Sequence, residues 1–529
     1  MTNSEVSIAK ADKSISQRNE HYFLSLSDFL RNNATLIGFL GAIALAAYGF
    51  ELFNLHLTID EELHSYASNS LEWIKQGRWG MFLLSYFLFP QPVIPFAPLF
   101  IALAFQLLAI VVLLDAWGAK ENLGKMSGGA IAMAYPGMVY IYAFSTINFG
   151  IGIGLFMVAL SVLVFVRTNG AIRLLSALPA TLALSIYQGL AAGLAVAFIV
   201  YIVANTIKSG RHRVDFSELV LIAIVGILSI VLYSVSQMIA IAVSGLKIGY
   251  VDQFFDLIFL WQHPAEVIRR LHITVSNIYT GSASYFGISV GMVPVVTGLA
   301  IGSLGVRLVQ CELQMFSKFV IGLLCVSITL LPFALGLVMR GELPLRTVVA
   351  MPIALAGLIA LGAYGRTWIF ANILGFAVAF CVFQFVVSTN AMFSSSALAL
   401  ESDRLIAARL LERIEAARME AGTDQIRYLE VVGYPNIPPT RLKPKSEVIG
   451  ASFFEWDQGN VYRILLFINT LESKDWKALP SAEQRALIEV TSIMPSWPSY
   501  GSVRVFGDTA VVKFGEYSYS QLRKQSATP

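Results

Sequence analysis

The sequence predicts a mainly α-helical, polytopic membrane protein with about eleven transmembrane helices and a soluble C-terminal α+β domain. Of the 529 residues, 56% are hydrophobic and 13% are charged, whereas soluble domains contain roughly 25% charged residues. Long apolar runs recur between Thr35 and Val387, and uncharged runs of about 18 residues or more are typical of bilayer spans. After Ser394 the composition becomes mixed and rich in turns, which predicts a separate soluble domain.

The apolar runs set the expected spans and the domain limits. Residues 1–33 form a polar N-terminal segment, 34–390 a membrane domain and 391–529 the soluble domain. The polar start and the length of the first apolar run argue against a cleavable signal peptide. The membrane domain has two large external loops, 56–92 and 247–284. The expected spans are 34–55, 93–114, 126–145, 149–166, 174–189, 190–207, 217–244, 285–306, 319–339, 347–364 and 367–389.

Positive charge sets the expected orientation, because Lys and Arg are enriched in short cytoplasmic loops. With the N-terminus inside, four successive cytoplasmic turns receive such residues, and the C-terminal domain lies on the outer face. The residues of these turns are Lys120 and Lys125, Arg167 and Arg173, Lys208, Arg211 and Arg213, and Arg307 and Lys318. We therefore expect a multi-pass protein in a lipid bilayer with a cytoplasmic N-terminus.

Charge, cysteine content and motifs exclude several classes of function. The net charge of +3 is too small to suggest nucleic-acid binding. Cys311, Cys325 and Cys381 all lie in or beside spans, which excludes a disulfide framework in the C-terminal domain and argues against a thiolate zinc site there. The chain has no P-loop, nucleotide fingerprint or Ser-His-Asp motif. No cofactor is expected.

The C-terminal domain is expected to combine one amphipathic helix with strands and shorter helices. The amphipathic helix covers Glu401–Ala421, and its expected apolar face consists of Leu405, Ala408, Leu411, Ile414 and Ala417. The expected strands are Tyr428–Val432, Val503–Phe506 and Ala510–Phe514, and the expected shorter helices are Val461–Leu471 and Ala482–Val490. Turns rich in Pro and Gly separate them, which favours a compact α+β domain.

An acidic segment directly follows the first span, where the chain leaves the bilayer. Asp60, Glu61 and Glu62 stand at the start of an expected helix, 60–75, that lies along the membrane interface. One interpretation is structural, since Thr58 followed by Glu61 fits a capping box and acids suit the first turn of a helix. The other is chemical: Asp60 or Glu61 is a general base that takes a proton from an acceptor hydroxyl.

A metal site is a third interpretation of the same segment. His56, Asp60 and His64 are each four residues apart, so a continuous helix would align them as ligands. A helix break at Thr58 would destroy this alignment, and the sequence favours a site without metal.

Short motifs at both ends of the chain resemble those of one family of membrane enzymes. Ile59-Asp60-Glu61, followed by Trp73 and Gly77-Arg78, resembles the start of the O-antigen (serotype-converting) glucosyltransferases, which are GT-C-type enzymes. In that family two acids follow the first span, and the second is usually Asp where this chain has Glu61. The likeness in the C-terminal half rests on Asp403-Arg404-Leu405 with Arg413-Ile414, Gly450–Trp456 with Arg463, and Met494–Pro498 before Gly501–Val503.

The resemblance implies a GT-C-like fold and a glucosyltransferase of the bacterial inner membrane with a periplasmic C-terminal domain. The implied donor is glucose on undecaprenyl phosphate, a polyprenyl phosphate. The implied acceptor is an O-antigen-like polysaccharide or lipopolysaccharide on the periplasmic face. Asp60 aligns with the first acid of the family, so it is our choice of base for an inverting transfer, with Glu61 as the alternative.

Two arginines occupy a short external loop, where the charge rule does not expect them. They are Arg340 and Arg346, in the segment Met339–Arg346. Snorkelling to headgroups or pairing with Glu342 would explain them. A clamp on the donor phosphate would explain them equally, because arginine makes bidentate contacts to phosphate oxygens. Arg78 in the first loop offers the same charge, and fixed cations of this kind would stabilise a departing polyprenyl phosphate.

Four further side chains are candidates for substrate binding. Lys75 and Glu62 lie in the first external loop, and snorkelling would also account for Lys75. Trp261 and His263 lie in the second loop, where aromatic and polar groups suit a bound sugar but are also ordinary occupants of membrane interfaces. The sequence favours snorkelling for Lys75, an interfacial position for Trp261 and a structural role for His263 before Pro264.

A glycosyltransferase is therefore the function that the sequence favours. The alternatives are a transporter or flippase of lipid-linked sugars, and a non-enzymatic anchor for the C-terminal domain. A transporter would place ionisable residues at mid-bilayer, often in repeated halves, whereas the acids here lie at the boundary and no repeat is visible. An anchor would not explain acids and arginines on one face. We expect these two sets of charges to share one water-facing cavity.

Overall fold

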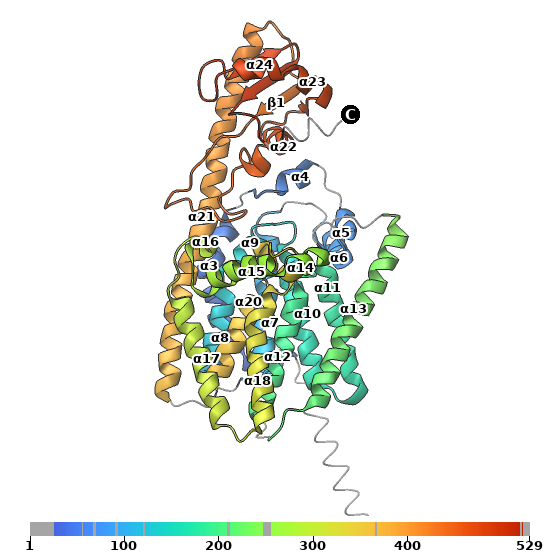
Figure 1. Ribbon diagram of the computed structural model, residues 1–529, viewed down its shortest axis with the longest axis vertical. Coiled ribbons are helices and arrows are strands. Elements are labelled where there is room, and N and C mark those ends of the chain that lie inside the picture. The colour runs from blue at the N-terminus through green and yellow to red at the C-terminus, as the bar shows by residue number, and fades with distance from the viewer. Residues whose placement is uncertain are drawn as a thin grey trace, which may run out of the picture.

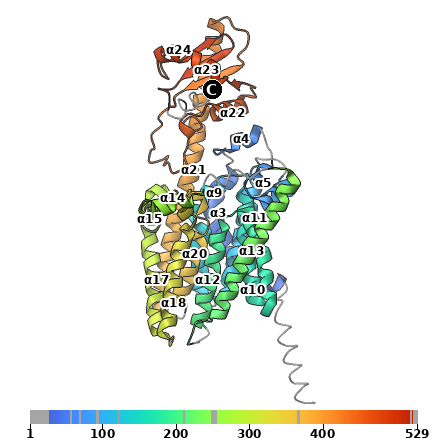
Figure 2. The ribbon, with the colours of Figure 1, turned by 45° about the vertical axis from the view of Figure 1, so that its right-hand side comes forward.

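A bundle of helices carries a smaller domain on one of its ends (Figure 1). The computed structural model describes residues 26–54, 57–66, 70–89, 94–119, 122–208, 212–246, 255–364, 368–518 and 521. A short helix of the first external loop, α4 (Glu61–Tyr66), lies between the bundle and the smaller domain in both views, and a second, α5 (Glu72–Lys75), lies at the end of the bundle (Figures 1 and 2). The acidic segment therefore sits where the two parts meet.

Eight helices of the described residues are long and apolar enough to cross a membrane. Each contains an apolar stretch of at least 18 residues, which matches a hydrocarbon core about 30 Å thick. They are α3 (Ala34–Phe53), α7 (Ala97–Ala116), α10 (Asn148–Arg167), α12 (Leu190–Lys208), α13 (Phe216–Ser244), α17 (Met292–Gln310), α18 (Met315–Leu330) with η3 (Leu331–Phe333), and α21 (Trp368–Glu420). A short helix, α2 (Leu26–Asn32), precedes the first of them.

The other three expected spans are short or interrupted, so the count of about eleven is not confirmed. Span 126–145 divides into α8 (Asn122–Ala134), η1 (Pro136–Met138) and α9 (Val139–Tyr142), because Pro136 cannot continue the helix before it. Span 174–189 consists of η2 (Gly170–Ser176) and α11 (Ala177–Ile186), and span 347–364 of η4 (Leu345–Thr347) and α20 (Met351–Ala363). A further short apolar helix, α6 (Trp79–Leu88), lies within the expected first loop.

The second external loop is largely helical. Its helices are α14 (Leu257–Gln262), α15 (Pro264–Tyr279) and α16 (Ala283–Phe286), and α19 (Leu335–Val338) lies nearby in the fold. α14 and α15 lie across the end of the bundle that faces the smaller domain (Figure 1). Residues 247–254, at the start of this loop, lie outside the described residues.

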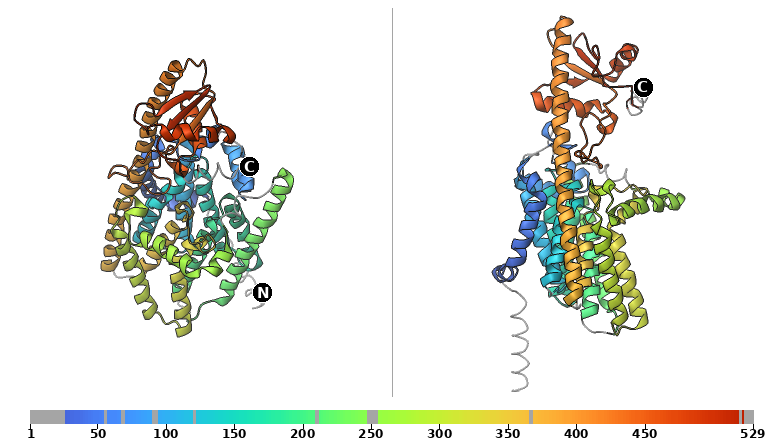
Figure 3. Two further views of the ribbon diagram at one scale, coloured as in Figure 1. Left: turned by 45° about the horizontal axis from the view of Figure 1, so that its top comes forward. Right: turned by 90° about the vertical axis from the view of Figure 1, so that its left-hand side faces the viewer.

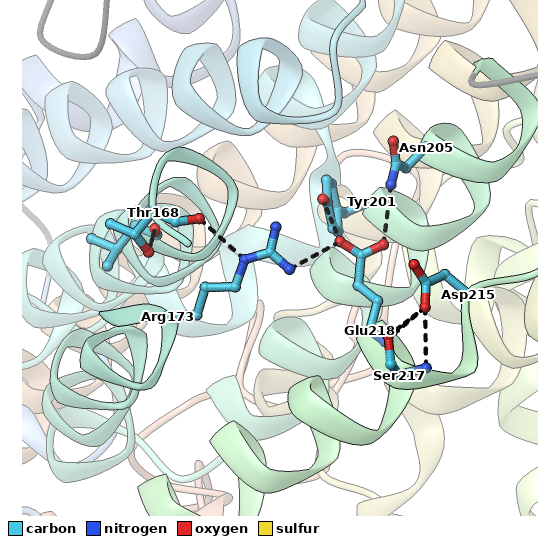
Figure 4. Close-up of polar contacts among 8 residues, drawn as sticks. Thr168, Arg173, Tyr201, Asn205, Asp215, Ser217 and Glu218 are labelled. Atoms are coloured by element: carbon cyan, nitrogen blue, oxygen red, sulfur yellow. Dashed lines mark hydrogen bonds and ion pairs between the residues drawn. The ribbon is translucent and has the colours of Figure 1, made fainter. Parts of the chain in front are cut away.

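A buried carboxylate organises the opposite end of the bundle (Figure 4). Glu218, at the start of α13, accepts hydrogen bonds from the Tyr201 hydroxyl at 2.8 Å and the Asn205 amide at 3.1 Å. Arg173 Nη1 lies 3.4 Å from the same carboxylate, and Asp215 caps the helix. A charge taken out of water needs such partners. The network therefore ties α12, α13 and η2 together, and Arg173 of the expected inner turn is part of it.

One helix joins the two parts of the molecule without a break. α21 has 53 residues, which corresponds to about 80 Å at roughly 1.5 Å per residue, and it runs beside the bundle and on along the smaller domain (Figure 3). The change in composition near Ser394 therefore falls within a continuous helix. Its buried face in the smaller domain is shifted from the expected one, because Leu405 and Ala408 are exposed whereas Ala407 and Leu410 are buried. Ile414 is buried as expected, and Leu411 and Ala417 pack against the core.

The smaller domain is built around a four-stranded sheet in the order β2-β1-β4-β3. Its elements are β1 (Tyr428–Val432), η5 (Trp456–Gln458), α22 (Val461–Glu472), β2 (Lys477–Ala478), α23 (Ser481–Ala486), α24 (Ile488–Ile493), β3 (Val503–Phe506) and β4 (Thr509–Lys513). β1 is parallel to β2 and β4, and β3 and β4 are antiparallel. The α+β class and the three expected strands are confirmed, the last one shifted by a single residue.

The hydrophobic core of the smaller domain includes part of the acidic segment. Ile59 is buried in the same cluster as Phe453, Phe467 and Leu429, and Leu57 packs against that cluster. The first external loop is therefore held by apolar burial in a domain that lies some 400 residues later in the chain.

A second contact fixes the smaller domain to the bundle. Ser446 donates a hydrogen bond to the Ser284 carbonyl oxygen at 2.7 Å, and its hydroxyl lies 2.6 Å from that of Tyr140. The adjacent Glu447 accepts a hydrogen bond from the backbone N–H of Leu345 at 2.6 Å. The domain is thus attached to the bundle at two places, through Ile59 of the first external loop and through Ser446 and Glu447. Two separate attachments restrict rotation of the domain on the bundle.

Candidate active site between the bundle and the C-terminal domain

A cavity of about 580 Å³ lies between the end of the bundle and the C-terminal domain. Ligand pockets typically enclose about 300–1,000 Å³ and combine apolar walls with a few polar groups. The charged residues of its wall are Asp60, Arg78, Arg346, Asp457 and Arg463. Its aromatic residues are Trp73, Phe144, Tyr187, Phe255 and Trp456. An acid of the first loop and arginines from two other segments thus share one space.

The interrupted spans end at this cavity. Phe144 follows α9, Gln188 and Gly189 separate α11 from α12, and Thr347 ends η4, and all four line the wall. Within a membrane, irregular backbone is tolerated only where it is buried in protein or lines a cavity. The spans are therefore short because their ends make room for the cavity.

Asp60 occupies a backbone conformation that residues other than glycine rarely adopt. Its φ is +82°, and α4 begins at the next residue. Its Oδ1 accepts a hydrogen bond from Nη2 of Arg463 at 2.8 Å, and its side chain is 42% exposed. Strained conformations of this kind persist where the surroundings hold them, and they cluster at functional sites.

Glu61 is buried and is not part of the cavity wall. Its Oε2 accepts the backbone N–H of Thr58 at 2.8 Å, which is one half of the expected capping box. Its Oε1 accepts the backbone N–H of Ser145 at 2.7 Å and also the Ser145 hydroxyl. The hydroxyl of Thr58 donates to the Ala143 carbonyl oxygen instead of completing the box. Glu61 therefore anchors the loop to the turn after α9.

Arg463 of α22 brings three carboxylates together. Its Nη2 contacts Asp60 at 2.8 Å, its Nη1 contacts Glu62 at 2.5 Å and its Nε contacts Asp457 at 2.8 Å. Its side chain is only 13% exposed. Glu62 is fully buried, and burial raises its pKa while Arg463 lowers it. Glu62 forms an ion pair with the guanidinium of Arg463 and does not line the cavity.

Arg78 is held at the cavity by the backbone and by aromatic rings. Its guanidinium lies over the Tyr187 ring at 4.9 Å and the Trp73 ring at 5.7 Å, and Nη1 donates to Gln76 at 2.8 Å. The preceding Gly77 has a φ of +74°. Such cation–π contacts orient the guanidinium without neutralising it.

Arg346 reaches the same cavity from the turn before α20. Its Nη1 lies 4.0 Å from Glu447 of the C-terminal domain, and its guanidinium lies over the Phe144 ring at 5.9 Å. Its carbonyl oxygen accepts a hydrogen bond from the Tyr187 hydroxyl at 3.3 Å. Arg346 therefore occupies a fixed place in the wall.

The remaining expected site residues do not line the cavity. Arg340 pairs with Asp256 at 2.7 Å, not with Glu342, and is 54% exposed. Lys75 pairs with Glu72 at 2.5 Å. Trp261 is 89% exposed, and the exposed His263 packs against the Phe259 ring at 4.8 Å. All four therefore lie outside the cavity wall, and three of them have other partners.

The alignment needed for the metal interpretation is not present. Residues 57–60 are not helical, so no continuous helix joins the positions of His56 and His64. His56 itself and the His64 side chain lie outside the described residues. Among the residues that the structure does describe, no group of three His, Cys, Asp or Glu side chains is placed to hold a metal ion.

Sequence reasoning missed the contribution of the C-terminal domain to the wall. Trp456, Asp457 and Arg463 line the cavity, as does Gln188, whose amide donates to the Gln76 carbonyl oxygen at 2.9 Å. Trp456 and Arg463 stand in a motif that carries the family resemblance, and that was the available signal. Their spatial partner in the first loop was not visible from the sequence.

Comparison with known proteins identifies the family. A family model described as Glucosyl transferase GtrII matches residues 49–361, which is more than half of the 529 residues. The match includes Asp60, Arg78 and Arg346 and ends before the C-terminal domain. No curated protein and no solved structure matches the chain. The resemblance to O-antigen glucosyltransferases is thereby confirmed, and the chain belongs to the GtrII glucosyl transferase family.

Proposed function

We propose that the protein transfers glucose from a polyprenyl phosphate to an O-antigen-like polysaccharide on the periplasmic face of the inner membrane, with inversion at the anomeric carbon. The observation that carries this proposal is that Asp60, Arg78 and Arg346 line one cavity in a chain of the GtrII family. An inverting transfer requires one base and a stabilised leaving group.

Asp60 is the proposed base. It takes the proton of the acceptor hydroxyl while the hydroxyl oxygen attacks the anomeric carbon. The bond between that carbon and the phosphate oxygen breaks, and the polyprenyl phosphate leaves with the bonding electron pair. Attack from the face opposite the phosphate inverts the configuration. The described contact to Asp60 uses Oδ1, so Oδ2 is our choice of atom to receive the proton.

Arg78 and Arg346 are the proposed partners of the phosphate. Negative charge gathers on the phosphate as the sugar departs, so fixed cations stabilise the transition state more than the ground state. Phe255, Leu335 and Met339 give the same cavity an apolar wall, which suits a polyprenyl chain. The proposed base and the two arginines must line the same cavity, because much of the rate of a transfer between two substrates comes from aligning the donor with the acceptor.

The distribution of charge supports the periplasmic face. The turns between α12 and α13 and between α17 and α18 lie at the end of the bundle away from the C-terminal domain (Figures 1 and 2). Arg213 stands in the first of these turns, and Lys318 stands in the first turn of α18, directly after the second. Short basic turns favour the cytoplasmic side. The cavity at the other end would then open to the periplasm.

Reconstitution into liposomes tests the proposal. We expect transfer from polyprenyl-phosphate glucose and none from a nucleotide-linked glucose, with the acceptor polysaccharide on the side of the C-terminal domain. Nuclear magnetic resonance of the product should show the anomeric configuration opposite to that of the donor. Transfer from the nucleotide sugar alone, or a retained configuration, would contradict the proposal.

A further inference from the structure

The C-terminal domain inserts one arginine into the cavity beside the proposed base. α22 carries Arg463, and its Nη2 lies 2.8 Å from Oδ1 of Asp60. The arginine lies outside the segment that the family model matches, which ends at residue 361. The contact therefore joins the matched membrane domain to a domain with no assigned role.

The surroundings of Arg463 differ from those of an ordinary surface ion pair. Its side chain is 13% exposed, and Glu62, one of its partners, is fully buried. Oε2 of Glu62 has no hydrogen-bond partner among the described residues. Removing one member of a buried ion pair costs more than removing an exposed one, because it leaves an uncompensated charge out of water. The arginine is thus fixed in position by charge.

The backbone of the base depends on the same contact. Asp60 has a φ of +82°, which a non-glycine residue holds only when its surroundings impose it. On one side of Asp60, Ile59 is buried in the core of the C-terminal domain. On the other side, Arg463 binds its carboxylate together with that of Glu62. The C-terminal domain therefore holds both the main chain and the side chain at this position.

We propose that Arg463 is a positioning residue for glucosyl transfer: it orients the Asp60 carboxylate toward the cavity. This inference rests on the proposed role of Asp60 as base. Among the charged side chains of the cavity wall, Arg463 is the one that a hydrogen bond joins to the Asp60 carboxylate. The other two partners of Arg463, Glu62 and Asp457, hold its guanidinium in place.

The kcat and the KM for the donor, measured separately in the reconstituted full-length protein, test the inference. A base that is turned away from the acceptor hydroxyl slows the transfer step without weakening the binding of the donor. In Arg463→Gln we therefore expect kcat to fall by up to about 100-fold, while the KM for the donor stays close to the wild-type value. Arg463→Lys keeps a cation beside Asp60 and should restore part, but not all, of the lost kcat.

Asp457→Asn is the matched control. It also removes an ion pair of Arg463, at the same interface, but leaves the contact to Asp60 in place. Its kcat should fall less than that of Arg463→Gln. Limited proteolysis should show that every variant keeps the C-terminal domain docked on the bundle. If Arg463→Gln does not fold, an unchanged kcat in Arg463→Lys would overturn the inference.

The outcomes separate this inference from the proposed function. An unchanged kcat in a folded Arg463→Gln variant would show that Arg463 only helps to hold the C-terminal domain on the bundle. That result, together with an inactive Asp60→Asn variant, would overturn the inference and leave the proposed function standing. Full activity of Asp60→Asn would instead contradict the proposed role of Asp60 as base.

Discussion

Nη2 of Arg463 donates a hydrogen bond to Oδ1 of Asp60 at 2.8 Å, although the two residues are 403 positions apart. The contact places an acid of the first external loop and an arginine of the C-terminal domain in one cavity wall. Because Ile59 lies in the core of that domain, the segment around Asp60 packs together with the C-terminal domain. The C-terminal domain is therefore part of the candidate site.

The two arginines of the short external loop should differ in their effect on transfer. Arg346 lines the cavity, whereas Arg340 is exposed and pairs with Asp256. Loss of a preorganised partner of a developing charge costs about 10²-fold in turnover, while an exposed ion pair contributes roughly 0–1 kcal/mol. We expect Arg346→Gln and Arg78→Gln to lower kcat about 100-fold. Arg340→Gln is the control. Equal losses of kcat in Arg340→Gln and Arg346→Gln would contradict the proposed role of Arg346 in binding the donor phosphate.

Gly77 should not tolerate a side chain. Its φ is +74°, and a Cβ there would lie 2.8 Å from both Gln188 Nε2 and the Tyr233 hydroxyl. Gly77→Ala should therefore displace Arg78, lower the melting temperature and reduce transfer. Gly170→Ala is a matched control, since Gly170 also has a positive φ but meets nothing within 4 Å. Thermal unfolding in detergent and a transfer assay compare the two, and equal effects would argue against the role of the close contact.

Trp456 offers an aromatic face in the cavity wall, on the side of the C-terminal domain. If the acceptor sugar binds there, Trp456→Ala should raise the KM for the acceptor about tenfold or more, as for a residue that dominates an interface. The KM for the donor should stay unchanged, and Trp456→Phe should retain most of the affinity. Trp261→Ala serves as the control, because Trp261 is 89% exposed. A rise in the donor KM alone would place the donor at this face.

Glu430 should make the stability of the protein depend on pH. Burial in β1 raises its pKa to about 7, although Gln484 donates a hydrogen bond to it. A carboxyl with a raised pKa in the folded state binds its proton more tightly there than in the unfolded chain, where the pKa is about 4.3. Its contribution to stability is therefore complete below about pH 4 and is lost as the pH rises through about 7.

Melting temperatures between pH 4.5 and 8 check this expectation. Glu430→Gln keeps an acceptor for Gln484 and should flatten the decline on the alkaline side. Glu489→Gln removes an exposed acid of α24 and should leave the slope as it is. A decline that is the same in wild type and Glu430→Gln would show that another group titrates.

Local patterns predicted much of the C-terminal domain. The strands Tyr428–Val432 and Val503–Phe506 were predicted with the bounds that the structure has, because alternation and flanking turns are local signals. The buried face of α21 was predicted only in part, since Ile414 is buried as expected but Leu405 and Ala408 are exposed. The Asp403 carboxylate is buried on that face and accepts hydrogen bonds from the Ser452 hydroxyl and the backbone N–H of Phe453. A search for apolar residues does not select an acid.

In the membrane domain, hydropathy predicted the apolar spans but not where they are interrupted. Tyr187 and Phe144 are as apolar beside a broken helix as within an intact one, so the interruption of their spans was not visible. Arg340 and Arg346 stand in one short loop, and only their neighbours in space separate them. The role of Arg463 depends on a partner 403 residues away, which no local pattern records.

Transfer of glucose from polyprenyl-phosphate glucose by reconstituted Asp60→Asn tests the central claim most directly. Glu72→Gln is the matched control, since Glu72 is an acid of the same loop that pairs with Lys75 and does not line the cavity. We expect the Asp60→Asn variant to fold and to bind donor while its kcat falls by about 10²-fold or more. Glu72→Gln should match the wild type. Wild-type turnover in Asp60→Asn would contradict the claim that this carboxylate is the base.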